Sequence, residues 1–135
     1  MHTQEIISQH PDVQGQTNGA LIRCIEECYD CAQACTACAD ACLGEKDVRD
    51  LAQCIRLNLD CADVCTATGT IASRRTGSNE SVLKMVLQAC LEACARCGEE
   101  CRSHAQMHEH CRVCAEACES CQAACEEAQT SVQLQ

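Results

Sequence analysis

Cysteines at helical spacing dominate the chemistry that this sequence offers. The chain has 135 residues and 18 cysteines, and residues 24–42 follow the pattern C-x3-C-x2-C-x3-C-x2-C-x3-C. Steps of four and three residues return to one face of an α-helix, because a turn takes about 3.6 residues. The pattern predicts an amphipathic helix whose buried stripe carries thiols where leucine and isoleucine are usual. Thiolates bind soft metal ions, so we expect metal chemistry.

The other cysteines repeat this spacing in three further segments. The predicted metal ligands, which we call the sulfur shaft, are Cys24, Cys28, Cys31, Cys35, Cys38, Cys42, Cys54, Cys61, Cys65, Cys90, Cys94, Cys97, Cys101, Cys111, Cys114, Cys118, Cys121 and Cys125. Two cysteines four apart on a helix have Cβ atoms about 5 to 6 Å apart. An unstrained disulfide needs about 3.5 to 4.5 Å, so a metal ion between the two sulfurs fits such a pair better.

Four helices are needed to position these thiols. The first is predicted to start after an Asn18 cap and to end at Leu43, before Gly44. Asp47 resembles the start of a capping box for the second helix. The inward positions of that helix are Leu51, Cys54, Asn58, Cys61, Cys65 and Thr68.

The second half of the chain predicts two more helices. Ser78 or Asn79 is expected to cap the third helix, and a turn at 104–108 separates it from the fourth. Residues 1–17 are expected to form a loosely ordered arm or short helix, residues 18–128 the bundle, and residues 129–135 a polar tail. Short connections between helices with one non-polar stripe predict an all-α protein, an antiparallel up-down four-helix bundle with a cysteine-lined core.

Composition and charge restrict the function. The formal charge is −10 and no basic run occurs, so nucleic acid and anionic membranes are poor partners. Neither a transmembrane run nor a signal-peptide layout is apparent, and we expect a cytoplasmic protein. Thiols are normally reduced in that compartment, which favours metal binding over a disulfide framework.

Charge balance favours one metal. Metal-bound cysteines are thiolates, and no Lys or Arg occupies the predicted inward positions. Zinc held by four thiolates leaves about two negative charges at each site. One monovalent soft ion per sulfur leaves the shaft neutral, which favours multiple Cu(I) ions. A zinc or cadmium thiolate store of metallothionein type and a disulfide-stapled structural helical bundle remain the alternatives.

The Cys-x3-Cys and Cys-x2-Cys repeats on four predicted helices resemble those of the bacterial copper storage proteins. The resemblance covers about residues 18–128, and the lack of an export signal is similar to the cytosolic branch of that family. It implies that each bundle holds many Cu(I) ions, mostly by two thiolates each, and that bundles assemble as a homotetramer.

The two ends of the predicted bundle differ. An apolar plug is expected at one end from Leu21, Ile22, Ile71, Leu83, Val86 and Leu87. The opposite end gathers His104, Met107, His108 and His110. Histidine and methionine can pass Cu(I) inward, so this end is the predicted metal entry, with His104 and His108 favoured because they continue the stripe from Cys101. Asn58, at an inward position, is a candidate weak ligand or a partner of a sulfur.

Repetition of the thiols indicates capacity rather than a single reactive site. We therefore expect a store that is not an enzyme. The acidic surface would suit a basic cytosolic copper chaperone as a partner.

Overall fold

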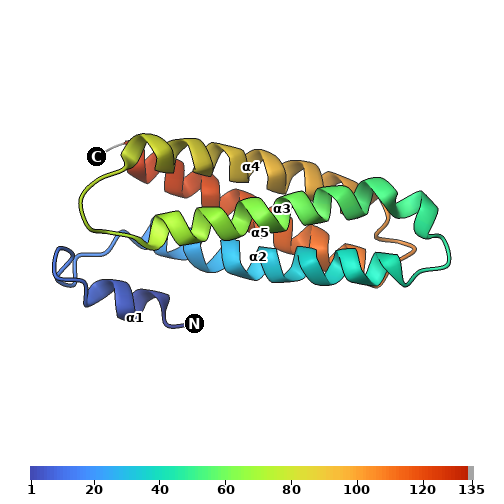
Figure 1. The fold of residues 1–135 in the computed structure, drawn as a ribbon, viewed down its shortest axis with the longest axis horizontal. Helices are drawn as coiled ribbons and strands as arrows, with labels where there is room; N and C mark the ends of the chain where they lie inside the picture. Colours follow the sequence, from blue (N-terminus) through green and yellow to red (C-terminus); the bar gives the residue numbers. More distant parts are fainter. Residues whose placement is uncertain (134–135) are drawn as a thin grey trace.

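The chain folds into four long helices and one short one. The computed structural model describes residues 1–133. Its elements are α1 (Thr3–Ser8), α2 (Gly19–Leu43), the 3₁₀ turn η1 (Val48–Leu51), α3 (Ala52–Ser73), α4 (Glu80–Ser103) and α5 (Glu109–Gln133). The long helices run antiparallel, α2 and α4 each packing on α3 and α5 (Figure 1). The predicted up-down bundle is confirmed.

Two helix starts on the first half of the chain depend on different interactions. Asn18 caps α2 as predicted, because its Oδ1 accepts a hydrogen bond from the Leu21 amide at 3.1 Å. Its amide nitrogen also donates to Ser131 Oγ at 3.0 Å, which ties the start of α2 to α5. The capping box at Asp47 was a wrong prediction, since its side chain makes no cap bond. The carboxylate instead pairs with His108 at 3.0 Å, and the chain enters α3 through η1.

The later helix boundaries agree with the predicted turn at 104–108 but not with the predicted tail. Asn79 precedes α4 without a side-chain cap bond. Helix α5 continues to Gln133, past Gln129, where we expected a polar tail. Ala128 and Val132 are buried, so one apolar stripe extends the helix beyond its last cysteine.

The N-terminal residues form a short helix beside the bundle. In Figure 1, α1 lies near the end of the bundle that holds the α3–α4 connection. Ile7 is 8% exposed and joins the core, and His10 Nε2 lies 3.0 Å from Thr76 Oγ1 in the α3–α4 connection. Gln14 and Gly15 both have positive φ, which reverses the chain between α1 and α2.

The core consists mainly of sulfur. All 18 cysteines are buried, none more than 2% exposed. The expected plug lies where α2 begins and α3 ends: Leu21, Ile22 and Leu87 are buried, and Ile71, Leu83 and Val86 are half-buried. Thiols therefore fill the middle of the bundle, and larger aliphatic side chains close one end.

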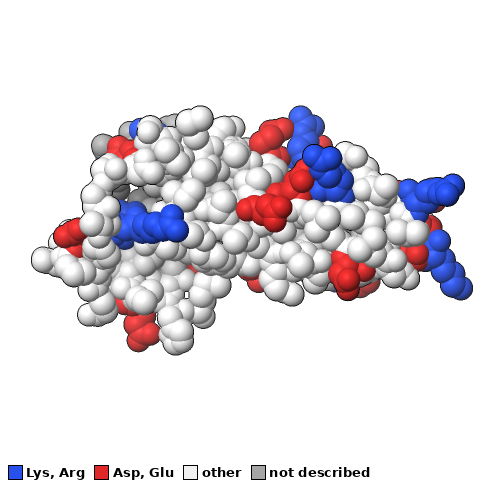
Figure 2. Space-filling model, viewed as in Figure 1, with Lys and Arg blue, Asp and Glu red and all other residues white. Residues whose placement is uncertain are grey.

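The outer surface carries both acidic and basic side chains, and the chain has twice as many acidic residues as Lys and Arg. Figure 2 shows acidic and basic side chains dispersed over one face, with uncharged areas between them. Exposed ion pairs include Arg56 with Asp60 and Arg96 with Glu92, each at 2.8 Å. Such exposed pairs contribute little to stability. Among the described residues no helix combines the length and apolar character of a membrane span.

The burial of Leu87 in the plug predicts that shortening this side chain lowers the stability of the fold. Leu87 is fully buried, so Leu87→Ala should destabilise the metal-free protein by about 2 to 5 kcal/mol through lost burial and the cavity left behind. Urea unfolding followed by circular dichroism measures this change. The matched control is Leu59→Ala at an exposed helix position, which should cost far less. Equal effects of the two substitutions would contradict a structural role for the plug.

Candidate metal centre

The sulfurs of neighbouring helices lie in contact along the bundle axis. Sγ atoms are 3.6 Å apart for Cys24 and Cys125, 3.7 Å for Cys28 and Cys90, and 3.8 Å for Cys61 and Cys94. These separations are nearly twice the S–S bond length of about 2.05 Å. All 18 cysteines are free thiols. The shaft therefore holds dense sulfur without cross-links.

Pairs within one helix have the geometry that their spacing predicts. The Sγ atoms are 3.9 Å apart in the Cys24/Cys28 pair and 3.8 Å apart in the Cys31/Cys35 pair. Side chains four residues apart share a helix face, so each pair offers two sulfurs to one ion.

Groups of four thiols overlap along the shaft. Examples of all-cysteine groups with sulfurs within 4.8 Å of one another are Cys28/Cys90/Cys121/Cys125, Cys31/Cys65/Cys94/Cys121, Cys31/Cys35/Cys61/Cys118 and Cys35/Cys97/Cys114/Cys118. Cys31, Cys35, Cys118 and Cys121 each belong to two of them. The arrangement suits ions that share thiolates more than separate four-thiolate sites.

Burial raises the pKa of two thiols near the histidine end of the shaft. Desolvation, followed by repulsion from the neighbouring Cys54, raises the pKa of Cys42 to about 11 and that of Cys111 to about 12. Thiolate is the metal-binding form, so an ion that binds here must displace protons.

Asn58 supplies an amide inside the sulfur shaft. It is fully buried, and its Oδ1 accepts from Cys97 Sγ at 2.9 Å and from Cys114 Sγ at 3.2 Å. Its Nδ2 donates to Cys54 Sγ at 3.6 Å. The structure therefore places Asn58 as a partner of sulfurs, and its oxygen faces the positions that an ion would take.

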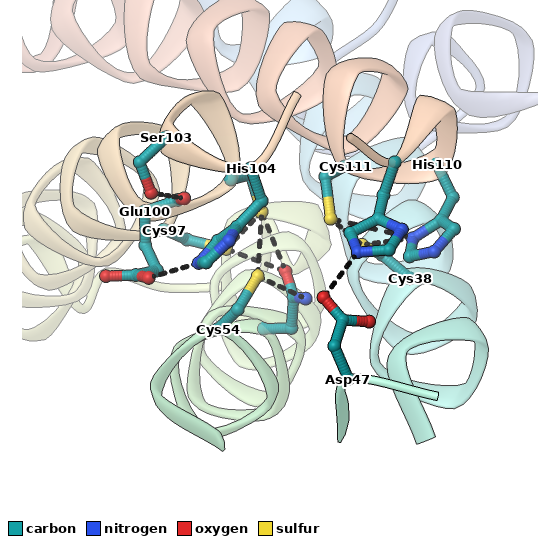
Figure 3. A network of polar contacts seen from close by, with 12 residues as sticks. Cys38, Asp47, Cys54, Cys97, Glu100, Ser103, His104, His110 and Cys111 are labelled. Atoms are coloured by element: carbon teal, nitrogen blue, oxygen red, sulfur yellow. Dashed lines mark hydrogen bonds and ion pairs between the residues drawn. The ribbon is translucent and has the colours of Figure 1, made fainter. Parts of the chain in front are cut away.

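His110 is the histidine that reaches the sulfurs. Its Nδ1 lies 3.4 Å from Cys38 Sγ and 3.7 Å from Cys111 Sγ (Figure 3). Its Nε2 lies 2.9 Å from a carboxylate oxygen of Glu45. The first turn of α5 thus directs an imidazole nitrogen toward the end of the shaft.

His104 and His108, which the sequence favoured, contact carboxylates at the same end. His104 Nε2 is 2.8 Å from Glu100, as Figure 3 shows. His108 lies between Glu45 at 2.8 Å and Asp47 at 3.0 Å, and its ring stacks on His110 with centroids 5.5 Å apart. The stripe from Cys101 did not predict these contacts, because α4 ends at Ser103 and the stripe ends with it.

This end also holds Met107, which the sequence predicted as an entry residue, and three carboxylates, which it did not. Met107 is 75% exposed and lies on the turn between α4 and α5. The carboxylates of Glu45, Asp47 and Glu100 were not predicted as functional residues. Only the four-residue separation of Glu100 and His104 gave a signal for such a contact.

Comparisons with known proteins agree with this geometry. The family model described as copper storage protein matches residues 17–130. None of the curated proteins compared with the chain is significantly similar to it.

Solved structures from Streptomyces lividans are similar over most of the chain. The copper storage protein Ccsp loaded with 10 copper equivalents is 57% identical, covers 95% of this chain and 98% of its own, and has a TM-score of 0.91. A cytosolic copper storage protein with five coppers is 64% identical, covers 82% of this chain and 92% of its own, and has a TM-score of 0.81. A Ccsp histidine-to-alanine mutant is 62% identical, covers 84% and 94% respectively, and has a TM-score of 0.82.

The contact between His108 and Asp47 predicts a pH dependence in the metal-free protein. The hydrogen bond that the Asp47 carboxylate accepts from the imidazole raises the pKa of His108, and the same bond lowers the pKa of Asp47. The stabilisation from His108 is therefore present at low pH and is lost as pH rises through its raised pKa. The stabilisation from Asp47 is lost only when pH falls through its own lowered pKa.

Asp47→Asn should lower the pKa of His108, because the amide carries no charge to favour the imidazolium. An NMR titration of the histidine ring protons measures the change. His2, which is exposed on the N-terminal segment, is the internal control, and its ring-proton signals should not respond to the substitution. An unchanged His108 titration would contradict the assignment of its pKa shift to Asp47.

Proposed function

The chain belongs to the copper storage protein family, and on that premise we propose that it stores many Cu(I) ions in the sulfur shaft, about one for each cysteine. The observation that carries the proposal is a continuous core of 18 buried free thiols whose sulfurs touch from helix to helix. The S. lividans relative with 10 copper equivalents supports such multiple loading. As the similar S. lividans protein is cytosolic, we place this store in the cytoplasm.

The charge balance of the core supports a monovalent metal ion. Among the described residues the buried polar or charged side chains are Thr3, Asn58 and Thr68, so no buried Lys or Arg offsets a charged shaft. Each Cu(I) that replaces one thiol proton leaves the total charge unchanged. A divalent ion on four thiolates would leave about two negative charges in the same dry interior.

A zinc or cadmium store of metallothionein type is the second candidate. The four-thiol groups have compatible sulfur separations. Charge argues against it, because among the described residues no buried Lys or Arg offsets the negative charge that thiolates keep around a divalent ion. The sulfur separations of 3.6 Å and more argue against a disulfide-stapled bundle.

We assign metal entry to the end of the bundle that holds the histidines. His104, Met107, His108, His110 and Asn58 are the residues proposed to pass Cu(I) inward. Their burial supports a path: Met107 is exposed, the three histidines are partly buried, and the fully buried Asn58 has its Oδ1 2.9 Å from Cys97 Sγ. At the opposite end the plug closes the shaft.

The store is proposed to be non-catalytic and to act in detoxification, in supply of copper, or in both. A single reactive thiol beside a base is the usual arrangement of a thiol enzyme. Here His110 contacts two thiols of one metal-ligand group, which favours metal binding.

Two partners complete the proposal. Assembly into a homotetramer is proposed from the resemblance of the cysteine repeats to those of the copper storage proteins. The net charge of −10 would attract a basic cytosolic copper chaperone that loads or empties the store.

The capacity can be measured directly. Titration of the reduced, anaerobic protein with Cu(I), against a chelator of known affinity, should show a sharp end point near one ion for each of the 18 cysteines. An end point of one or two ions would contradict storage. Tight binding of four or five Zn(II) ions in preference to Cu(I) would favour the metallothionein-like alternative.

The entry path predicts a kinetic effect without a loss of capacity. His104→Ala combined with His108→Ala should slow Cu(I) uptake, because the ion then lacks imidazoles at the surface, while the final stoichiometry stays almost the same. Stopped-flow uptake from a Cu(I) chelate compares the variant with wild type. His2→Ala with His10→Ala is the matched control, since both histidines lie outside the bundle. A large fall in stoichiometry, or uptake at the wild-type rate, would contradict this entry path.

A further inference from the structure

One ligand group at the histidine end differs in composition from the four all-cysteine groups. It comprises Cys38, Cys42, Cys111 and His110, and we call it the mouth cluster. Its ligand atoms lie within 4.8 Å of one another. Three thiols and one imidazole are the ligand set of a common class of structural zinc site.

The measured separations match the edges of a zinc tetrahedron. Bonds of about 2.3 Å to sulfur and about 2.0 Å to nitrogen give edges of about 3.8 Å between sulfurs and about 3.5 Å from sulfur to nitrogen. The Cys38 and Cys111 sulfurs are 4.0 Å apart, and His110 Nδ1 lies 3.4 and 3.7 Å from them. Small side-chain movements would centre an ion among these atoms.

Charge favours a divalent ion here more than deeper in the shaft. One Zn(II) with three thiolates and a neutral imidazole carries one net negative charge, against two for a four-thiolate site. The His110 side chain is 26% exposed, so water reaches the edge of the cluster and lessens the cost of that charge. The all-cysteine groups are fully buried.

A carboxylate orients the imidazole. Glu45 lies 2.9 Å from His110 Nε2, so the proton on that nitrogen leaves Nδ1 as the free ligand atom. His108 stacks on the same ring and limits its rotation. A carboxylate, a histidine and a metal position in this order are typical of zinc sites.

From these observations we propose that the mouth cluster binds one Zn(II) ion in the copper-free protein. The ion joins the end of α2 to the start of α5 and closes the entry end of the sulfur shaft. Because Cys38, Cys42 and Cys111 are also storage ligands, Zn(II) leaves when Cu(I) fills this end. The site goes beyond the proposed function, since its occupant is divalent and its ligand set contains a histidine.

Co(II) tests the site, because tetrahedral thiolate coordination gives it intense visible and charge-transfer absorption. Titration of the reduced, anaerobic, copper-free protein should give this spectrum with an end point of one ion per chain, and one equivalent of Zn(II) should abolish it. His110→Ala should remove the one-equivalent spectrum. Glu45→Gln should weaken binding by about 10-fold to 100-fold, as expected when a partner of a metal-bound histidine is lost.

Two variants provide controls. His2→Ala, which replaces an exposed histidine outside the cluster, should leave the spectrum intact. His110→Cys should keep tetrahedral binding with stronger charge-transfer absorption, because four thiolates replace three, which separates ligand loss from misfolding. A weak octahedral spectrum with wild-type protein, or a one-equivalent spectrum that survives His110→Ala, would overturn the proposal. The Cu(I) end point, measured separately, tests storage independently of either result.

Discussion

The bundle depends on burying thiols that carry no charge until metal arrives. Each buried thiol is a small apolar side chain while protonated, so the 18 cysteines can serve as a core for a chain with a single aromatic residue. If the same thiols ionised without a cation, the interior would hold many unpaired charges. The raised pKa values of Cys42 and Cys111 are one expression of that cost. Stability of the empty fold and affinity for soft cations therefore arise from the same side chains.

The two ends of the bundle keep the buried sulfurs from solvent in different ways. At the plug, Leu21, Ile22 and Leu87 exclude water from the sulfurs. At the opposite end, histidines and carboxylates form paired contacts around the last thiols, with His108 between Glu45 and Asp47. Polar side chains that satisfy one another can line an opening without exposing the sulfurs. The bundle thus has one apolar end and one polar end.

The sequence predicted the features that follow from helical periodicity and missed those that depend on contacts between distant segments. Helical spacing predicted the helices and the inward position of Asn58, and the capping preference of asparagine predicted the Asn18 cap, because each is local to one helix. Asp47 was misassigned because its partner, His108, is 61 residues away. His110 was ranked below His104 for a similar reason: the start of α5 relative to α2 decides which imidazole meets Cys38. The extent of α5 to Gln133 depended on the burial of Val132, which a polar local sequence concealed.

The overlap of the thiol groups has a consequence for how metal moves. A sulfur such as Cys31 or Cys118 belongs to two groups at once, and each of the four all-cysteine groups named above shares at least one ligand with another of them. An ion can therefore advance by exchanging one sulfur for the next while it keeps hold of another. Such stepwise transfer along the all-cysteine groups needs no release of the ion into water. A cation in the shaft would then stay bound to at least one thiolate at every step.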